Sequence, residues 1–213
     1  TKQMPCGPLE WGGQRFESDC GGTLSLTSAF AFSTNSVALR LSRRIGLDQV
    51  VNQARALGIT TPLDAVPGLA LGQSEVRLIE LTAAYAAVAN NGVWNPPSTI
   101  RRLVDAETCV QESAGRCRSL SERGSLNPSR RAMRPDTARR MQKLLQTVVR
   151  SGTGRAAFLG GSEGGKTGTT NDGRDLLFIG YEPSRHWVLG IWLGNDDNSP
   201  TASSSGLAAT LWG

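Results

Sequence analysis

A glycine-rich window, residues 160–169 (GGSEGGKTGT), holds the side chains with the clearest chemical potential. If its second half is a β-strand, Thr167 and Thr169 lie on one face, because alternate side chains of a strand share a face. Two hydroxyls on one face can bind a carboxylate, and Lys166 adds a positive charge beside them. Gly168 lets a ligand approach the backbone, whose edge amides can pair with a peptide or polarise a carbonyl. The window therefore predicts a strand that binds a carboxylate or an extended peptide.

The same window also fits two other patterns. From Gly160 to Thr167 it fits G-x-x-x-x-G-K-[ST], the loop that cradles phosphates at the start of a helix. Ser162 fits the nucleophile elbow G-x-S-x-G, with Asp175 and His186 following in the order of a hydrolase triad. Both patterns need a helix directly after them, whereas turn residues and an apolar run follow here. A nucleotide-binding loop remains an alternative, and His186, the only histidine, is expected in a partly exposed hairpin.

A second candidate site is Ser33-Thr34-Asn35, which lies between two helical stretches. A Ser-x-Asn turn can direct a hydroxyl and a carboxamide toward one cleft, where they serve as a proton relay and an amide-binding group. The simpler alternative is that Asn35 or Ser36 caps the next helix. Together with the Lys-Thr-Gly tripeptide, this turn makes two of the three motifs of the serine penicillin-recognising enzymes.

Apolar periodicity predicts the helices that position these motifs. After Asn35, an apolar residue recurs every fourth position until Gly46, at Val37, Leu41 and Ile45. Further stripes predict helices from Leu47 to Leu57, from Leu78 to Asn91-Gly92, and from Pro135, a favourable first-turn residue, to Gly152. Most of the predicted helical content therefore precedes the glycine-rich window.

After Gly152 the period changes to that of strands. Residues 175–181 (DLLFIGY) and 187–193 (WVLGIWL) are nearly continuous apolar runs, which predict strands buried on both faces and joined by a hairpin. The turn signal Asn171-Asp172-Gly173 predicts a further strand at residues 165–169. The predicted fold class is α/β, with helices first and an antiparallel sheet late in the chain.

The remaining segments have weaker patterns. Residues 100–104 are expected as a short strand, and residues 207–212 as a helical turn. Residues 105–133 are polar and contain the two late cysteines, so we expect an irregular insert there.

Composition narrows the class of protein. The chain has 213 residues, near the length of one large domain or two small ones, and 38% of them are hydrophobic, which excludes disorder throughout. A net charge of +5 favours anionic surroundings, but no arginine run is interleaved with aromatic residues, so nucleic-acid binding is not expected. Residues 1–15 contain no signal-peptide core, and residues 20–39, although uncharged, are too polar to span a bilayer.

Four cysteines occur as two close pairs, Cys6 with Cys20 and Cys109 with Cys117. Neither spacing is that of a zinc site, so no metal and no cofactor is expected. Of the three connectivities, sequential pairing closes the smallest loops, with a stabilisation of about 3 kcal/mol per bridge. We expect the disulfides Cys6–Cys20 and Cys109–Cys117 and an extracytoplasmic location, with reduced thiols in loops as the alternative.

Five segments, in order along the chain, resemble the transpeptidase domain of class A (bifunctional) penicillin-binding proteins. They are residues 28–46, 70–100, 148–157 (VVRSGTGRAA), 164–183 (GGKTGTTNDGRDLLFIGYEP) and 191–197 (IWLGNDD). The resemblance implies the penicillin-binding/β-lactamase-like transpeptidase fold, an antiparallel sheet flanked by helices. Residues 7–16 and the extra cysteines are similar to cyanobacterial members.

The resemblance also implies an activity, D,D-transpeptidation of peptidoglycan. In that reaction a serine is acylated by the penultimate D-Ala of one stem peptide, and an amine of a second stem then attacks the acyl-enzyme. β-Lactam antibiotics mimic the D-Ala-D-Ala end and trap the serine. The implied location is the periplasm, with an anchor in the inner membrane.

The resemblance also implies roles for individual residues, which are assigned here through the matching motifs. Ser33 would move protons toward the leaving amine, Asn35 would hold the substrate amide, and Lys166 would supply positive charge. The residues implied to bind the terminal carboxylate and the reacting carbonyl are Thr167, Gly168 and Thr169. We expect both motifs to converge on one cleft.

The chain departs from the family in its first motif, Ser-x-x-Lys, which supplies nucleophile and base. The positions three before Lys143 and Lys166 are Arg140 and Glu163, so the motif does not occur. Residues 1–213 are therefore expected to be the C-terminal portion of a transpeptidase domain, with nucleophile and membrane anchor in an upstream segment. This chain alone is expected to be inactive. A non-catalytic peptidoglycan-binding module is the other alternative.

Overall fold

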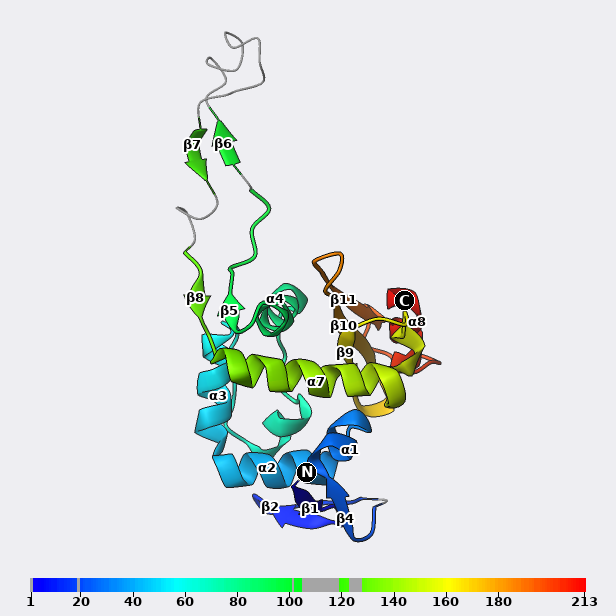
Figure 1. Ribbon diagram of the computed structural model, residues 1–213. Helices are drawn as coiled ribbons and strands as arrows, with labels where there is room; N and C mark the ends of the chain where they lie inside the picture. The colour runs from blue at the N-terminus through cyan, green and yellow to red at the C-terminus, as the bar shows by residue number, and fades with distance from the viewer. Residues whose placement is uncertain (1, 19, 101, 105–118, 123–127) are drawn as a thin grey trace.

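The computed structural model of the protein describes residues 2–18, 20–100, 102–104, 119–122 and 128–213 (Figure 1). Its longer helices are α2 (Asn35–Ile45), α3 (Leu47–Ala56), α4 (Leu78–Ala89) and α7 (Pro135–Ser151). Its shorter helical segments are α1 (Leu26–Ala31), α8 (Ser205–Trp212), η1 (Pro67–Leu71), η2 (Arg155–Ala157) and η3 (Asn171–Gly173). The four helices predicted from periodicity are confirmed to within one or two residues.

Local sequence explains where these helices begin and end. Gly46 separates α2 from α3 with a φ of 95°, a conformation that glycine adopts without steric cost. Helix α7 has Pro135 in its first turn, where the missing amide leaves no hydrogen bond unmade. The buried stripe of α7 ends in Val148 and Val149, and the helix stops at Gly152. Helix α7 crosses the molecule and reaches the sheet with its C-terminal half (Figure 1).

The sheet has three antiparallel strands in the order β11-β10-β9. Their bounds are β9 (Gly164–Thr169), β10 (Asp175–Glu182) and β11 (Trp187–Gly194). In the register, Lys166 pairs with Ile179, and Thr167 pairs with Phe178. The predicted late antiparallel sheet is therefore confirmed, and β9, which carries the Lys-Thr-Gly motif, lies at its edge.

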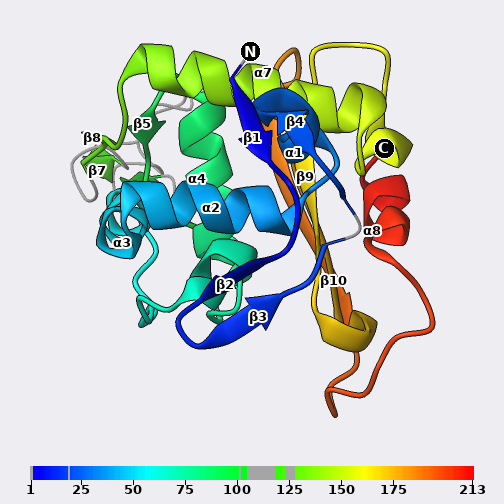
Figure 2. The same ribbon diagram turned by 90° about the horizontal axis from the view of Figure 1, so that it is seen from below.

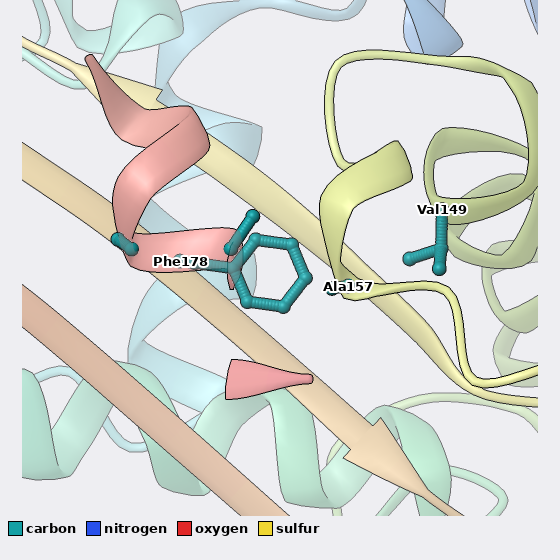
Figure 3. Close-up of a cluster of buried hydrophobic side chains, with 5 residues drawn as sticks. Val149, Ala157 and Phe178 are labelled. Carbon is teal, nitrogen blue, oxygen red and sulfur yellow. The ribbon is translucent and has the colours of Figure 1, made fainter. Parts of the chain in front are cut away.

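Helices cover both faces of the sheet. Helix α8 packs over one face, where Phe178 belongs to a cluster that also contains Val149, Ala157, Ala208 and Ala209 (Figure 3). Helices α4 and α7 pack on the other face, where Tyr181 contacts Val88 and Leu145. Because of this arrangement, β10 is the most buried strand, and helices pack against both faces of the sheet at β9.

The expectation that both apolar runs are buried on both faces is wrong for β11. Trp187, Leu189 and Trp192 are exposed, at 63%, 48% and 43% of their surface. Strand β11 is the outer strand of the sheet, so β10 flanks it on one side alone. A continuous apolar run can thus belong either to a strand buried on both faces or to a half-covered edge strand. The sequence pattern does not distinguish these two cases.

Short strands also precede the helices, where no strand was predicted. Strand β1 (Gln3–Pro5) pairs with β4 (Thr23–Ser25), and β2 (Leu9–Trp11) pairs with β3 (Gln14–Phe16). Gly12 and Gly13 have φ angles of 62° and 74°, as a two-residue hairpin turn requires. Elements this short have too few residues for a periodic signal.

The disulfide Cys6–Cys20 is confirmed, with Cα atoms 5.5 Å apart. The bridge joins the segment after β1 to the segment before β4. Cys6 is fully buried beside α1 and α2. The expected pair Cys109–Cys117 lies outside the residues that the structure describes.

The described residues of the segment 105–133, which is expected to be an irregular insert, include two short strands. Strand β7 (Ser119–Glu122) pairs with β6 (Arg102–Val104), and β8 (Arg130–Arg131) pairs with β5 (Val93–Trp94). These strands form an arm that extends away from the helices in Figure 1. Their pairing uses backbone groups and needs no apolar alternation, which explains why the polar sequence did not reveal it.

Among the described residues, no helix is long and apolar enough to cross a membrane.

Candidate active site

The two predicted motifs meet through one hydrogen bond. The ammonium of Lys166 on β9 donates to the hydroxyl of Ser33, which follows α1, at 2.9 Å between Nζ and Oγ. The two residues are 133 positions apart in the sequence. In Figure 2, α1 lies next to β9 beyond the end of α2. The tertiary structure thus brings the Ser-x-Asn and Lys-Thr-Gly motifs to one place.

The turn that presents Ser33 is strained. Phe32 is the C-cap of α1, and Ser33 has a φ of 55°, in the left-handed region that residues other than glycine rarely adopt. Backbone bonds from the Ser33 amide to the Phe30 carbonyl (3.2 Å) and from the Thr34 amide to the Ala29 carbonyl (2.8 Å) hold it there. Such strain is typical of functional sites. The result is a serine hydroxyl exposed above the sheet edge.

Asn35 and Ser36 do not cap α2, so the simpler alternative is wrong. Thr34 occupies the N-cap position and makes no side-chain cap bond. The Ser36 hydroxyl instead donates to the carbonyl of Cys6, at 2.6 Å. Asn35 is the first residue of α2, two positions after Ser33, and it is exposed. Asn35 is thus an exposed residue at the start of α2, near Ser33 in the sequence.

Burial lowers the pKa of the Lys166 ammonium to about 8. Its second acceptor is the carbonyl of Thr167, at 3.0 Å. Near neutral pH the ammonium remains mostly charged, and it donates to the Ser33 oxygen. The Ser33 proton is then directed elsewhere, and a hydroxyl that accepts from a cation becomes a better donor. The pair can therefore deliver a proton to a nearby atom.

Thr167 and Thr169 lie on one face of β9, as strand geometry requires. Thr167 is largely buried, whereas Thr169 is exposed near the end of the strand. Gly168 lies between them, and a Cβ atom added there would lie 3.4 Å from the Leu177 side chain. Among the described strands, only β10 pairs with β9, and an edge strand of this kind can pair with an extended ligand on its other side. Hydroxyls and edge amides are thus available next to the Lys166 ammonium.

Sequence reasoning did not assign a role to Thr153, which lies beside Thr167. The two hydroxyl oxygens are 2.6 Å apart, so one of them donates to the other. Thr153 belongs to residues 148–157 (VVRSGTGRAA), one of the five segments that resemble the transpeptidase family. That segment was the one signal in the sequence for this contact.

Glu163 was also missed. Its side chain is 1% exposed, and its carboxylate accepts from the amides of Leu159 (2.6 Å) and Gly161 (3.0 Å). The loop that precedes β9 is therefore organised around a buried carboxyl group.

The two other patterns in the glycine-rich window are wrong. Residues 164–169 form strand β9 where a phosphate loop or a nucleophile elbow needs a helix. Ser162 contributes its carbonyl to a bond from Gln146. His186 lies in the exposed turn between β10 and β11, as expected. Among the described residues, no group of three or more His, Cys, Asp or Glu side chains could hold a metal ion.

A family model described as the penicillin binding protein transpeptidase domain matches residues 2–211. The chain belongs to this family.

Curated relatives agree with this assignment to the transpeptidase family. The chain is 31% identical to penicillin-binding protein 1A of Aquifex aeolicus, over 95% of this chain and 27% of that protein. It is 32% identical to penicillin-binding protein 1B of Vibrio cholerae, over 90% of this chain and 23% of that protein. The chain thus spans about a quarter of the length of these relatives.

Solved transpeptidase structures share the fold. The D,D-transpeptidase domain of a peptidoglycan glycosyltransferase from Eggerthella lenta has a TM-score of 0.72 at 24% identity, covering 98% of this chain and 58% of that one. Penicillin-binding protein A of M. tuberculosis, as an imipenem acyl-enzyme complex, has a TM-score of 0.76 at 21% identity, covering 99% of this chain and 53% of that one. The expected transpeptidase fold, an antiparallel sheet flanked by helices, is confirmed.

Proposed function

We propose that this chain is the substrate-binding and proton-relay portion of a peptidoglycan D,D-transpeptidase domain that works through a serine acyl-enzyme. The observation that carries the proposal is the bond from Lys166 to Ser33, because it joins the two family motifs in one polar site at the edge of β9. Its substrates are peptidoglycan stem peptides, and β-lactam antibiotics bind the same site. The imipenem acyl-enzyme of the M. tuberculosis neighbour supports the second point.

In this proposal the donor stem peptide lies along the free edge of β9. Its terminal carboxylate accepts hydrogen bonds from the hydroxyls of Thr167 and Thr169, and the Lys166 charge stabilises it. Gly168 allows the peptide to approach the backbone. The Thr169 amide donates to the carbonyl oxygen of the penultimate D-Ala as negative charge develops there, a contact that typically contributes roughly 3 kcal/mol to catalysis. Asn35 holds the substrate amide.

Proton transfer then runs through Ser33. When the nucleophilic serine attacks the penultimate D-Ala, the C–N bond to the terminal D-Ala breaks and the departing nitrogen needs a proton. Ser33 donates that proton, and the Lys166 ammonium restores it to the Ser33 oxygen. A pKa of about 8 allows Lys166 to give up a proton near neutral pH and regain one in the next half-reaction.

The nucleophile is not among these 213 residues in this proposal, because the chain contains no Ser-x-x-Lys. An upstream segment supplies the serine and its base lysine and completes the cleft. The complete protein works in the periplasm and is anchored to the inner membrane by that upstream region.

Intact-mass spectrometry after incubation with penicillin tests the proposal. We expect no stable adduct on residues 1–213 alone, and one adduct per molecule, on the upstream serine, when the upstream segment is present. Penicillin with a hydrolysed β-lactam ring serves as the control for non-covalent binding. A stoichiometric adduct on Ser33 or Ser162 in the chain alone would overturn the assignment of the nucleophile. The absence of any adduct on the longer protein would support a non-catalytic binding module instead.

A further inference from the structure

The segment Gly152-Thr153-Gly154 is held tightly between α1 and the sheet, yet the proposed reaction gives it no role. The Thr153 amide donates to the carbonyl of Ala31, at 3.1 Å, and Ala31 lies two residues before Ser33. Gly152 approaches the same carbonyl so closely that an added Cβ would lie 2.1 Å from the Ala31 oxygen. The backbone of Thr153 is thus fixed relative to the turn that carries Ser33.

The other side of the segment is equally constrained. An added Cβ at Gly154 would lie 3.1 Å from the ring of Phe178 and 3.2 Å from Val148. Phe178 pairs with Thr167 across β10 and β9. Thr153 therefore has little freedom to move, and its hydroxyl is directed at Thr167, 2.6 Å away.

Proton counting shows what this contact does to Thr167. A threonine hydroxyl has one proton to donate and two lone pairs with which to accept. If Thr167 donated to Thr153, it would have no proton left for a carboxylate. If Thr153 donates, the Thr167 oxygen accepts that bond and its own proton remains available to an anion.

We infer that Thr153 is a positioning residue that acts through Thr167: by donating to the Thr167 oxygen, it directs the Thr167 proton toward the terminal carboxylate of the stem peptide or β-lactam. This inference rests on the proposed function. Thr153 also connects the two motifs, since its amide holds the Ser33 turn and its hydroxyl holds β9. Thr153 thus contacts both the end of the helix that precedes Ser33 and the strand that carries Lys166.

Acylation kinetics of the full-length protein with a fluorescent penicillin test the inference. Thr153→Val keeps the shape and removes the donor, and we expect its second-order acylation rate constant to fall about tenfold, the usual effect of one hydrogen bond to a charged group. Thr153→Ser keeps the donor and should restore the rate. Thr147→Val on α7 is the matched control, because its hydroxyl binds only the Lys143 carbonyl of its own helix in the described contacts.

Two further measurements separate positioning from a general structural effect. With a penicillin methyl ester, which has no carboxylate, Thr153→Val and the native protein should react at similar rates. In a Thr167→Val background, Thr153→Val should have no additional effect, because the residue through which it acts is gone.

The results distinguish failure of the inference from failure of the proposed function. The positioning role would be overturned if Thr153→Val is acylated at the native rate. It would also be overturned if the rate constant falls equally with penicillin and with its methyl ester. A further loss in the Thr167→Val background would mean that Thr153 contacts the ligand directly, which also contradicts it. If the native full-length protein is not acylated at all, the proposed function fails first.

Discussion

The hydroxyl of Ser36 donates a 2.6 Å hydrogen bond to the carbonyl of Cys6, so the start of α2 is tied to the disulfide-bonded N-terminal strands. Ser18 donates to the same carbonyl, at 2.7 Å, and its oxygen is 3.3 Å from that of Ser36. The Cys6–Cys20 bridge therefore supports the segment that presents Ser33 and Asn35, although neither cysteine lies at the site.

Removing this disulfide should destabilise the protein. The bridge closes a loop with a sequence separation of 14, for which constraint of the unfolded chain predicts a loss of about 3 kcal/mol in the double variant Cys6→Ala, Cys20→Ala. Ser36→Ala alone should cost about 1 kcal/mol. The two losses should not add fully, because both changes release the same segment. Urea unfolding of the three variants measures these values, and an unchanged midpoint for the double cysteine variant would contradict the prediction.

The left-handed backbone of Ser33 predicts an unusual order of stability. Ser33→Gly should be more stable than Ser33→Ala by about 1 kcal/mol, because glycine adopts a φ of 55° without the clash of a Cβ atom. Both variants lose the hydroxyl that accepts from Lys166, so both should lose proton delivery.

The same pair of substitutions at Ser42, within α2, is the matched control for Ser33. There glycine should be less stable than alanine by about 1 kcal/mol, the ordinary order for a helix interior. Thermal unfolding of the four variants compares the two sites. If the alanine variant is more stable than the glycine variant at both positions, the backbone of Ser33 is not strained.

Lys166 should make stability depend on pH in a defined window. Its pKa falls from 10.5 to about 8 on folding, so between these values the unfolded chain binds a proton that the folded chain has released. The free energy of unfolding contributed by this residue must therefore rise with pH from about 8 to 10.5 and be constant below about 8.

Comparison with Lys166→Met isolates this effect. The difference in unfolding free energy between the native chain and Lys166→Met should shift in favour of the native chain as the pH rises through the window. Lys143→Met, at an exposed position on α7, controls for the loss of one positive charge. A difference that stays constant from pH 7 to pH 10.5 would show that the Lys166 ammonium is not desolvated.

Much of the fold follows from sequence alone, because its signals are local. Helices α2, α3, α4 and α7 were predicted from apolar stripes that end at glycine or begin at proline. The sheet followed from two apolar runs with turn residues on either side. The strand predicted at residues 165–169 followed from the turn after it, whereas the phosphate loop stayed an alternative until the structure showed β9 there. In each case the information lies within one element and the residues next to it.

The tertiary structure decided what depends on partners far apart in the chain. Strand β11 is as apolar as the buried β10, yet Trp187 and Trp192 on this outer strand are exposed. The short N-terminal strands and the β6–β7 pair are held by backbone bonds that no side-chain pattern records.

The candidate site likewise combines residues that the sequence identified with contacts that only the tertiary structure revealed. Sequence identified Ser33, Lys166 and Thr167 as residues of suitable chemistry, since their types and local spacing are visible there. It did not identify the hydrogen bond between Thr153 and Thr167, or the buried carboxylate of Glu163 before β9. Those contacts exist because α7 and its terminal glycines pack against α1 and the sheet, and the packing of separate elements determines which hydroxyl faces which.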